Sequence, residues 1–325
     1  MPVTFSYRPS LSAFAATMIL SACAGQQMGT AVGAIPQGLT SVATSAHGVA
    51  HKATSSNDLI YAVSPNVGYV LSYPQGALLG SFNPPTASHF LSACSDRNGD
   101  VFATVREGGV VEYTHGGTTA VETLNFDGEP GTCSVDPTTG NLAVSNDLAG
   151  YGDVGIYQGG QGEATYYTAN LEIYSACAYD DAGNLFVEGT TSTADHVYLA
   201  LTELPEGSGT FRALSLGKAP VKGRRPGGIE WEGSYLAMGV SKPPNHPQEI
   251  WHVKVSGSGG TIIGKTKAKG IYHWLIQGNT LISPYKPDYE NVAYWNYPKG
   301  GKPTGVINDG LAGLSALTVS VGSSR

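Results

Sequence analysis

The chain has 325 residues, of which 41% are hydrophobic and 13% are charged, and its formal net charge is −7. That length suits one large domain or two ordinary ones, and the composition excludes collagen, a coiled coil and a multi-span membrane protein. Binding to a phosphate backbone needs clustered positive charge, so an acidic chain with 18 Lys and Arg is not expected to bind nucleic acid.

Residues 1–22 have the pattern of a secretory signal. Arg8 is the only charged residue, an apolar run follows from Leu11 to Leu20, and small residues close it. The run is too short to span a bilayer as a mature helix. We therefore expect residues 1–22 to be removed on export.

The end of this signal, Leu20-Ser21-Ala22-Cys23, resembles the lipobox of bacterial lipoproteins. The resemblance implies cleavage before Cys23 and a lipid on its sulfur, with membrane contact through that anchor only. Acyl chains contribute about 0.8 kcal/mol per buried CH₂, so several together hold a protein on a membrane. The expected location is the bacterial cell envelope, and the non-acidic Ala24 favours the outer membrane. The alternative is an ordinary signal cut at Ala22-Cys23-Ala24, which would give a secreted or periplasmic protein.

Residues 23–55 are rich in Gly, Ala, Ser, Thr and Gln and show no clear period. Such a composition is typical of a flexible tether. Residues 56–325 form the body of the protein. Segments rich in Tyr, Val and Thr, broken by Gly and Asn, predict strands and tight turns there.

The body contains two recurring motifs. In the first, small and apolar residues lead to a turn with Asp, Asn or Gly, and a second apolar strand follows. It has four clear copies, one degenerate copy and one incomplete copy, which begin at Leu91, Pro130, Tyr174, Pro226, Tyr272 and Leu314. In the second motif, an aromatic or apolar residue precedes a Gly turn. Its six copies are spaced by 40, 44, 47, 51 and 42 residues and lie at Tyr73, Tyr113, Tyr157, Leu204, Val255 and Tyr297.

Each period holds about four strands of ordinary length with short turns, and four-stranded units of about 40–50 residues are propeller blades. The sequence therefore predicts an all-β fold, a six-bladed β-propeller. The first blade lacks an inner strand of its own, and the unpaired segment Leu314–Val321 can supply it. Closure by this C-terminal strand would leave no open sheet edge.

The repeats resemble those of the NHL and SMP-30/gluconolactonase-like propellers, where Gly-Ile-Ala-Val-Asp followed by Gly-Asn-Val-Tyr-Val is common. The likeness covers about residues 57–321. It implies the fold but no one function, because this fold carries many unrelated activities. Hydrolases of the SMP-30 group hold a divalent cation with inward-facing Glu, Asn and Asp. Here the matching positions are Ser, Ala, Gly and Thr, and we expect Asp96, Asp136 and Asp180 to satisfy turn backbone groups instead.

Three cysteines, Cys94, Cys133 and Cys177, are assigned to the same rung of successive inner strands, where the other blades have Ile229, Trp274 and Leu317. A three-thiolate metal site is one interpretation. Buried structural cysteines are the preferred one, because Cys packs as a small hydrophobe. Same-rung residues of adjacent blades are expected to lie beyond the roughly 7 Å Cα limit for a disulfide. The prediction is three buried free thiols and no metal site.

Residues just before each inner strand are expected to line one mouth of the central channel. We predict a binding site at that mouth, formed by a ring of polar and aromatic residues: His89, Glu129, Tyr174, Arg225, Tyr272, His273 and Asp309. The alternative is a solvated rim of charged loop residues, in which His273 would be a hydrogen-bonded channel residue.

The sequence lacks a Gly-x-Ser-x-Gly elbow and a His-Glu-x-x-His helix, and we expect no phosphate-cradling Gly-rich loop before Lys-Ser/Thr. We therefore expect no catalytic residue and no cofactor, and a monomer that binds an unknown protein, peptide or glycan. Two alternatives stay open. One is a lactonase-like hydrolase or lyase with an active site at the channel mouth and a divalent cation, and the other is a structural envelope component without a small ligand.

Overall fold

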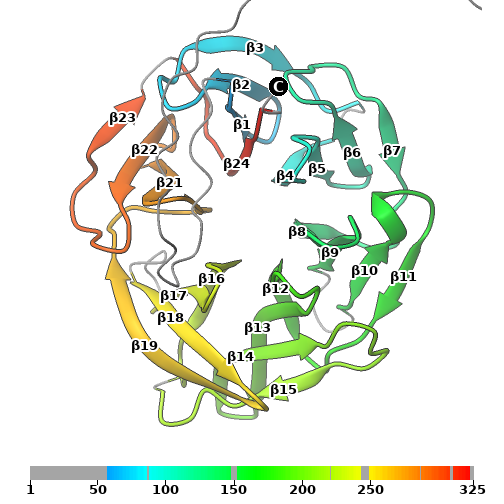
Figure 1. The fold of residues 1–325 in the computed structure, drawn as a ribbon, viewed down its shortest axis with the longest axis vertical. Helices are drawn as coiled ribbons and strands as arrows, with labels where there is room; N and C mark the ends of the chain where they lie inside the picture. Colours follow the sequence, from blue (N-terminus) through cyan, green and yellow to red (C-terminus); the bar gives the residue numbers. More distant parts are fainter. Residues whose placement is uncertain are drawn as a thin grey trace, which may run out of the picture. The chain divides into compact units, whose positions relative to one another are not determined.

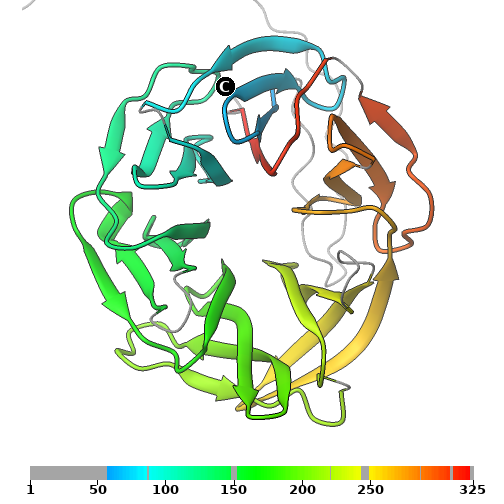
Figure 2. The ribbon, with the colours of Figure 1, turned by 180° about the vertical axis from the view of Figure 1, so that it is seen from behind.

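The computed structural model describes residues 57–85, 88–147, 152–219, 221–242, 249–285, 287–307 and 310–322. Within these ranges 24 strands form six four-stranded antiparallel sheets, and η1 (Gln158–Gly160) is a single 3₁₀ turn. The six sheets stand around a common axis as blades (Figure 1), and the view from behind shows the same ring (Figure 2). The predicted all-β, six-bladed β-propeller is confirmed.

The signal, the lipidation site at Cys23 and the tether all lie outside the described residues, and so does Asp309. In the part of the chain that is described, no helix has the length and apolar character needed to cross a membrane.

Each blade has four strands, which we count from the axis outwards, and blades 1–6 follow the chain order of their second strands (Figure 1). The innermost strands of blades 1–6 are β24 (Ala316–Ser320), β4 (Phe90–Ser95), β8 (Pro130–Val135), β12 (Ile173–Tyr179), β16 (Arg225–Trp231) and β20 (Leu275–Gln277). The second strands are β1 (Leu59–Val63), β5 (Val101–Val105), β9 (Leu142–Asn146), β13 (Leu185–Thr193), β17 (Leu236–Ser241) and β21 (Thr280–Tyr285). The third strands are β2 (Gly68–Ser72), β6 (Gly109–Tyr113), β10 (Val154–Tyr157), β14 (His196–Leu204), β18 (Glu249–Ser256) and β22 (Asn291–Asn296). The fourth strands are β3 (Leu78–Phe82), β7 (Glu122–Leu124), β11 (Ala164–Tyr167), β15 (Arg212–Leu214), β19 (Gly259–Lys267) and β23 (Gly305–Ile307).

The turn between the first two strands of blades 2, 3 and 4 is built around an aspartate. In blade 2, Asp96 Oδ1 accepts the backbone N–H groups of Asn98 and Asp100 at 2.9 and 2.8 Å. In blade 3, Asp136 accepts the Thr138 N–H at 2.7 Å and the Thr139 hydroxyl, and in blade 4 Asp180 Oδ1 accepts the N–H groups of Ala182 and Asn184, each at 2.9 Å. A short carboxylate side chain can reach its own turn in this way, and the role predicted for these three residues is confirmed.

The ring is closed by the last strand of the chain. β24 pairs antiparallel with β1, so that Ala62 lies opposite Leu317 and Tyr61 lies opposite Thr318. Just before this strand, the Ser315 backbone N–H and hydroxyl both donate to Val63 O, at 2.7 and 3.0 Å. The two ends of the described chain therefore share blade 1, as predicted (Figure 1).

The apolar core is divided into six clusters, each between two neighbouring blades. Successive side chains of a strand point to opposite faces of the sheet, so every blade contributes one set of side chains to each neighbour. Trp251 lies in the cluster between blades 4 and 5, Trp295 lies in the one between blades 5 and 6, and both are fully buried. No blade contains a complete apolar core of its own, so the stability of each blade depends on its two neighbours in the ring.

Blade 6 begins later than the sequence predicts. Leu275, and not Trp274, pairs with Ile282 on the second strand, and Tyr272–Trp274 come before the strand. The indole Nε1 of Trp274 donates to Gly227 O of blade 5 at 2.8 Å, and a Cβ atom at Gly239 would come within 2.7 Å of that nitrogen. Trp274 therefore fills the space that the glycines of blade 5 leave open.

Candidate functional site

Four inner strands are bulged near the end at which they begin, which is the predicted channel mouth. The register shifts lie between Phe90 and Ser92, Pro130 and Cys133, Tyr174 and Ala176, and Pro226 and Ile229. A β-bulge interrupts the ladder and re-aims side chains, and such bulges are frequent beside functional sites. The repeated bulge turns small residues and peptide groups toward the axis at this end of the ring.

These bulges surround a cavity of about 500 Å³, which we call the start-side cavity. Its lining from the bulges and neighbouring strands is mostly small, with Ser92, Gly131, Thr132, Ser175, Ala176, Gly227, Gly228 and Ser241, and it also includes the apolar residues Phe90, Leu91, Pro130 and Pro226. Its lining from the surrounding loops is charged, polar or aromatic and includes Pro65, His89, Arg106, Glu129, Asp147, Tyr272, His273 and Ser315. The volume lies in the range of sites that take small ligands or single groups of larger ones.

Hydroxyl groups on the second strands hold the bulges in place. Thr104 Oγ1 accepts the Ser92 N–H at 2.9 Å and donates to Gly131 O of the next blade at 2.7 Å. Ser145 Oγ accepts the Thr132 N–H at 2.9 Å. These bonds satisfy peptide groups that the bulge removes from the ladder, and they fix the cavity wall before any ligand arrives.

Glu188 occupies the position in blade 4 that Thr104, Ser145 and Ser283 occupy in blades 2, 3 and 6. The side chain is fully buried, and its Oε2 accepts the N–H of Gly228, a cavity-lining residue, at 3.2 Å. The other oxygen, Oε1, has no hydrogen-bond partner among the described residues. Burial raises the pKa of this carboxyl well above its usual value, against the opposing effect of backbone N–H groups. Burial therefore favours the neutral form of Glu188, and its Oε1 atom has hydrogen-bonding capacity left over behind the cavity wall.

The loops of blades 2 and 3 place charges of both signs at the cavity. Arg106 Nη2 forms an ion pair with Glu129 Oε1 at 2.9 Å, and both side chains are partly exposed. Asp147 is tied to the same loop, because its N–H donates to Glu129 O at 2.9 Å. Partial burial and the neighbouring Glu129 charge raise the pKa of the Asp147 carboxyl. This side of the cavity can therefore pair with polar groups of either charge.

Tyr272 and His273 come from the segment before the inner strand of blade 6. Their rings meet edge to face with centroids 4.8 Å apart, and the Tyr272 ring also lies 5.2 Å from that of Tyr289. Burial lowers the pKa of His273 to about 4. At pH 7 the imidazole is neutral, so it offers one donor and one acceptor nitrogen.

The structure brings together four of the seven residues predicted for the mouth: His89, Glu129, Tyr272 and His273. Tyr174 does not line the cavity, because its ring is fully buried in the cluster between blades 3 and 4 and its hydroxyl accepts the Ala169 N–H at 2.7 Å. Arg225 is exposed at the start of its strand and does not line the cavity either.

Several lining groups are missing from the sequence-based prediction. Arg106 and Asp147 lie on loops between second and third strands, which the prediction did not consider. Glu188 could have been noticed, because it breaks a series of small hydroxyl residues at equivalent positions. The bulge glycines Gly131, Gly227 and Gly228 have a local signal, since Pro-Gly at a strand start favours an irregular backbone.

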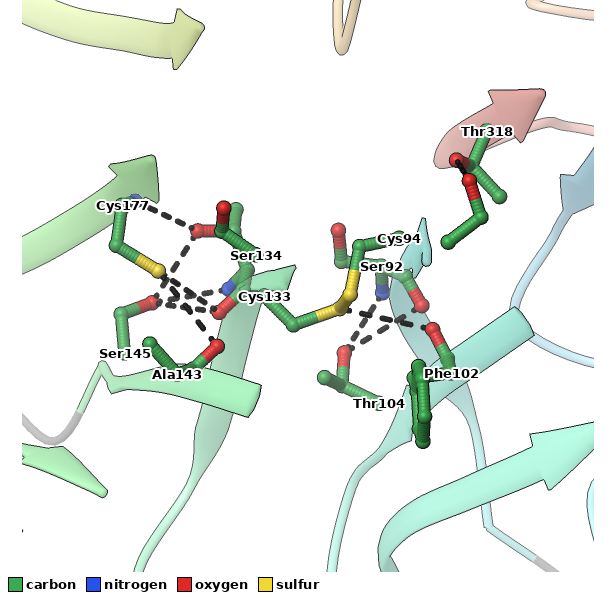
Figure 3. The surroundings of a disulfide bond; sticks show 12 residues. Ser92, Cys94, Phe102, Thr104, Cys133, Ser134, Ala143, Ser145, Cys177 and Thr318 are labelled. Atoms are coloured by element: carbon green, nitrogen blue, oxygen red, sulfur yellow. Dashed lines mark hydrogen bonds between the residues drawn. A yellow bond between two sulfur atoms is a disulfide. The ribbon is translucent and has the colours of Figure 1, made fainter. Parts of the chain in front are cut away.

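The cysteine prediction is wrong for two of the three residues. Cys94 and Cys133 form a disulfide with a Cα–Cα distance of 5.6 Å (Figure 3). Cys94 is two residues before the turn aspartate Asp96, whereas Cys133 is three residues before Asp136. They are therefore one step out of register, and because side chains alternate along a strand, Cys94 points toward blade 3 while Cys133 points back toward blade 2.

The inner strands also approach one another more closely than expected. In blade 4, the Cys177 N–H donates to Thr132 Oγ1 of blade 3 at 3.2 Å, and the Tyr179 N–H donates to Ser134 Oγ of the same neighbouring strand at 3.1 Å. Neighbouring inner strands thus lie within one short side chain of each other. This spacing places the Cα atoms of facing cysteines inside the disulfide limit.

Cys177 is a buried free thiol, as predicted. Its Sγ donates weakly to Thr132 O and Ala143 O, each at 3.8 Å (Figure 3). Burial raises its pKa to about 12, so the thiolate that would react or bind a metal does not form at neutral pH. Among the residues that the structure describes, no group of three or more His, Cys, Asp or Glu side chains is placed to hold a metal ion.

The ring of blades and its axial cavity define a six-bladed β-propeller with a candidate binding site at one mouth. No protein-family model matches the chain, and no curated protein sequence matches it. Solved structures share the fold. A chain of the nidogen/laminin complex is 13% identical with a TM-score of 0.61, over 82% of this chain and 100% of that chain. A protein of unknown function from Bacteroides caccae is 12% identical with a TM-score of 0.59, over 82% of this chain and 99% of that chain. At such identities the likeness concerns the fold alone.

Proposed function

We propose that this propeller is a binding module that holds a polar segment of a peptide or glycan in the start-side cavity. The observation that carries the proposal is the repeated bulge, which presents hydroxyls and peptide groups of four blades around one cavity of about 500 Å³. Hydrogen-bonding groups fixed before binding give specificity with little loss of entropy on association.

The lining indicates the character of the ligand. Hydroxyl groups such as those of Thr132 and Ser175 suit hydroxyl and amide partners. The paired Arg106 and Glu129 can exchange their mutual contact for contacts with a ligand. The aromatic ring of Tyr272 offers an apolar surface beside them. A polar, largely uncharged segment with one apolar face matches this set better than a lipid or a multiply charged phosphate.

A ligand screen with two matched variants tests the proposal. Panels of oligosaccharides and short peptides are tested by the rise in melting temperature of the protein, and hits are measured by titration calorimetry. Ser175→Phe fills the cavity, and Arg106→Ala removes its cation. Each is expected to weaken a true hit about tenfold or more, whereas the exposed Lys302→Ala leaves the affinity unchanged. A hit that both cavity variants bind as well as the parent protein does would contradict the proposal.

We further propose that the protein is exported and carries a lipid on Cys23 in a bacterial envelope. The lipobox-like Leu20–Cys23 segment supports this, and so does the Cys94–Cys133 disulfide, because disulfides persist in oxidising compartments. In bacteria that express the full chain, a radiolabelled fatty acid is expected to label the parent protein and the Cys177→Ser variant but not Cys23→Ala. Equal labelling of Cys23→Ala would rule out the anchor.

A second candidate function is hydrolysis, and the neutral His273 in the same cavity favours it. A histidine that is unprotonated at pH 7 can act as a general base, and partial burial beside the Glu129 charge raises the pKa of the Asp147 carboxyl, which favours its protonated, proton-donating form. Turnover of lactone or ester substrates that is lost in His273→Gln would support an enzyme. Turnover that is unchanged in this variant would exclude this site as its source.

A further inference from the structure

The channel holds a second cavity at the opposite end of the inner strands, where they reach their turns. It measures about 340 Å³, and we call it the turn-side cavity. The lining comes from all six inner strands and the segments beside them, and it includes Tyr179, Trp231 and Trp274. Two carboxyl groups, those of Asp181 and Glu230, belong to it, and none of the described lining residues is Lys, Arg or His. The cavity therefore combines aromatic and acidic side chains without a basic one, unlike the start-side cavity.

Glu230 is the carboxylate that lies within an inner strand. Its Oε2 accepts the Ile276 N–H of blade 6 at 2.7 Å, which fixes the side chain between blades 5 and 6. Burial and the charge of nearby Glu232 raise its pKa well above the usual value. None of the ion pairs found among the described residues includes Glu230, Glu232 or Asp181. A partly buried carboxyl without a basic partner is costly to ionise, and a bound cation would lower that cost.

The two tryptophans are held by their own N–H groups. Trp231 Nε1 donates to Asp181 Oδ2 at 2.9 Å, and its ring is parallel to that of Phe186 with an interplanar angle of 4°. Trp274 Nε1 donates to Gly227 O at 2.8 Å. Both indoles are thus fixed in the empty protein. Indole faces attract cations, and the attraction is stronger where water is excluded.

We infer that the turn-side cavity binds an organic cation, an ammonium or guanidinium group on an apolar chain, with Glu230 as its counter-ion and the indoles of Trp231 and Trp274 as its walls. The volume accommodates a Lys or Arg side chain or a short diamine. An anion would meet an uncompensated carboxyl, and a neutral alcohol of the same shape would leave that carboxyl unpaired. This site lies outside the cavity on which the proposed function rests.

The inference predicts that a proton is released on binding. The ligand pairs with the ionised carboxyl of Glu230, whereas burial in the empty site favours the protonated form, so affinity is expected to rise with pH. Titration calorimetry with cadaverine, Nα-acetyl-lysine methylamide and Nα-acetyl-arginine methylamide measures this directly. Runs in two buffers of different ionisation enthalpy give the number of protons released, which is expected to be greater than zero.

Two cavity variants and one control variant complete the test. Glu230→Gln keeps the shape of the side chain and is expected to lower affinity about tenfold or more and to abolish proton release. Trp274→Leu is expected to weaken binding without changing proton release. The exposed Glu163→Gln, on an outer hairpin, is the matched control and binds as the parent does. Melting temperatures and near-ultraviolet circular dichroism confirm that each variant is folded.

Three results with the organic ligands would overturn the inference: no binding of any of the three amines at 10 mM, binding of the neutral alcohol 1-pentanol as strong as that of the amines, or unchanged affinity for the amines in Glu230→Gln. Displacement of the amine by calcium at equal concentration would instead make this an inorganic cation site and would also refute it. A preference for the lysine or arginine amide over cadaverine identifies a peptide side chain as the natural source, and the reverse preference identifies a free diamine.

Discussion

Cys177 lies relative to Ser134 as Cys133 lies relative to Cys94. The Sγ atom of Cys133 is 3.5 Å from the carbonyl oxygen of Phe102, which is the cross-strand partner of Cys94. The Sγ atom of Cys177 is 3.8 Å from the carbonyl oxygen of Ala143, which is the cross-strand partner of Ser134. The same backbone arrangement therefore occurs twice around the ring, and only one copy has two cysteines.

This equivalence predicts that Ser134→Cys forms a second disulfide, with Cys177. In a Cys23→Ser background, the denatured parent has one reactive thiol, and the variant is expected to have none after oxidation. Ser95→Cys is the matched control, because Ser95 faces blade 1, where its hydroxyl donates to Val319 O at 2.8 Å. That control is expected to keep both thiols free. A Ser134→Cys protein with two free thiols would show that the two arrangements differ.

The native disulfide should stabilise the fold measurably. It joins residues separated by 39 positions, and a loop of that length corresponds to about 3–4 kcal/mol in the chain-entropy description. Urea unfolding of the double variant Cys94→Ser/Cys133→Ser is expected to show a lower midpoint than the parent, and a reductant should shift the parent to a similar value. Peptide mapping without reduction should yield the linked pair 94–133. Identical midpoints with and without reductant would contradict this prediction.

Removal of the last strand should destroy the fold. A chain that ends at Gly313 lacks β24, so β1 loses its partner on the axis side. The core cluster between blades 1 and 6 loses Leu317 and Val319, and the cluster between blades 1 and 2 loses Ala316. We expect loss of a cooperative thermal transition and aggregation through the exposed edge. A chain that ends at Gly322 is the control and should melt as the parent does. A synthetic 314–322 peptide is expected to restore part of the transition.

The Arg212–Glu203 ion pair on the outer part of blade 4 should stabilise the fold more than the Lys265–Glu249 ion pair on blade 5. Arg212 makes a two-pronged contact with Glu203, with distances of 2.9 to 3.0 Å, and Glu203 is only 5% exposed in its side chain. Arg212→Ala leaves a buried carboxylate unpaired and is expected to cost about 1–3 kcal/mol, reduced from a fully buried pair because Arg212 is half exposed. Lys265→Ala removes a partly exposed contact to Glu249 and is expected to cost less than about 1 kcal/mol. Equal losses in urea unfolding would refute the difference.

Stability should fall as the pH rises from about 4.5 to about 8. Burial raises the pKa of Glu232 from 4.5 to about 8, so over this interval the folded protein keeps a proton that the unfolded chain has lost. The folded state is then favoured at low pH, and this contribution disappears as the pH passes the folded pKa. Glu188 and Glu230 act in the same direction.

Melting temperatures at pH 5 and pH 8 measure this effect. Glu232→Gln is expected to be more stable than the parent at pH 8, by on the order of 1 kcal/mol after allowance for solvent screening, and to differ little at pH 5. Glu249→Gln is a control of opposite sign, because the Trp251 hydrogen bond lowers the pKa of that carboxyl. A Glu232→Gln variant with the pH slope of the parent would contradict the assignment.

The sequence predicted what is set locally. The turn aspartates, the Gly turns that follow Tyr113 and Tyr157, and the unpaired segment at the end of the chain all have short-range signals, and these determine the blade count and the closure. The inner strand of blade 6 was predicted to include Trp274, because a tryptophan is common in strands. Trp274 instead packs over glycines of blade 5, and this role depends on contacts that are remote in sequence.

The site was predicted only in part, for a similar reason. Four mouth residues were found because the segments just before β4, β8 and β20 reach the start-side cavity. Tyr174 was misplaced because a bulge between it and Ala176 turns the ring into the core. The disulfide had a signal in the sequence, the different distances of Cys94 and Cys133 from their turn aspartates. That difference indicates a disulfide only when it is combined with the knowledge that the inner strands of adjacent blades face each other at close range.

The pairing of β1 with β24 has a consequence for biosynthesis. Leu59 lies opposite Ser320, so β1 can pair with β2 early but has no inner neighbour until residues 316–320 have been made. Contacts this distant along a chain form slowly, and until they form, the nascent protein carries a bare hydrogen-bonding edge. We expect ring closure to be the last folding event and the step at which a holding chaperone would matter most.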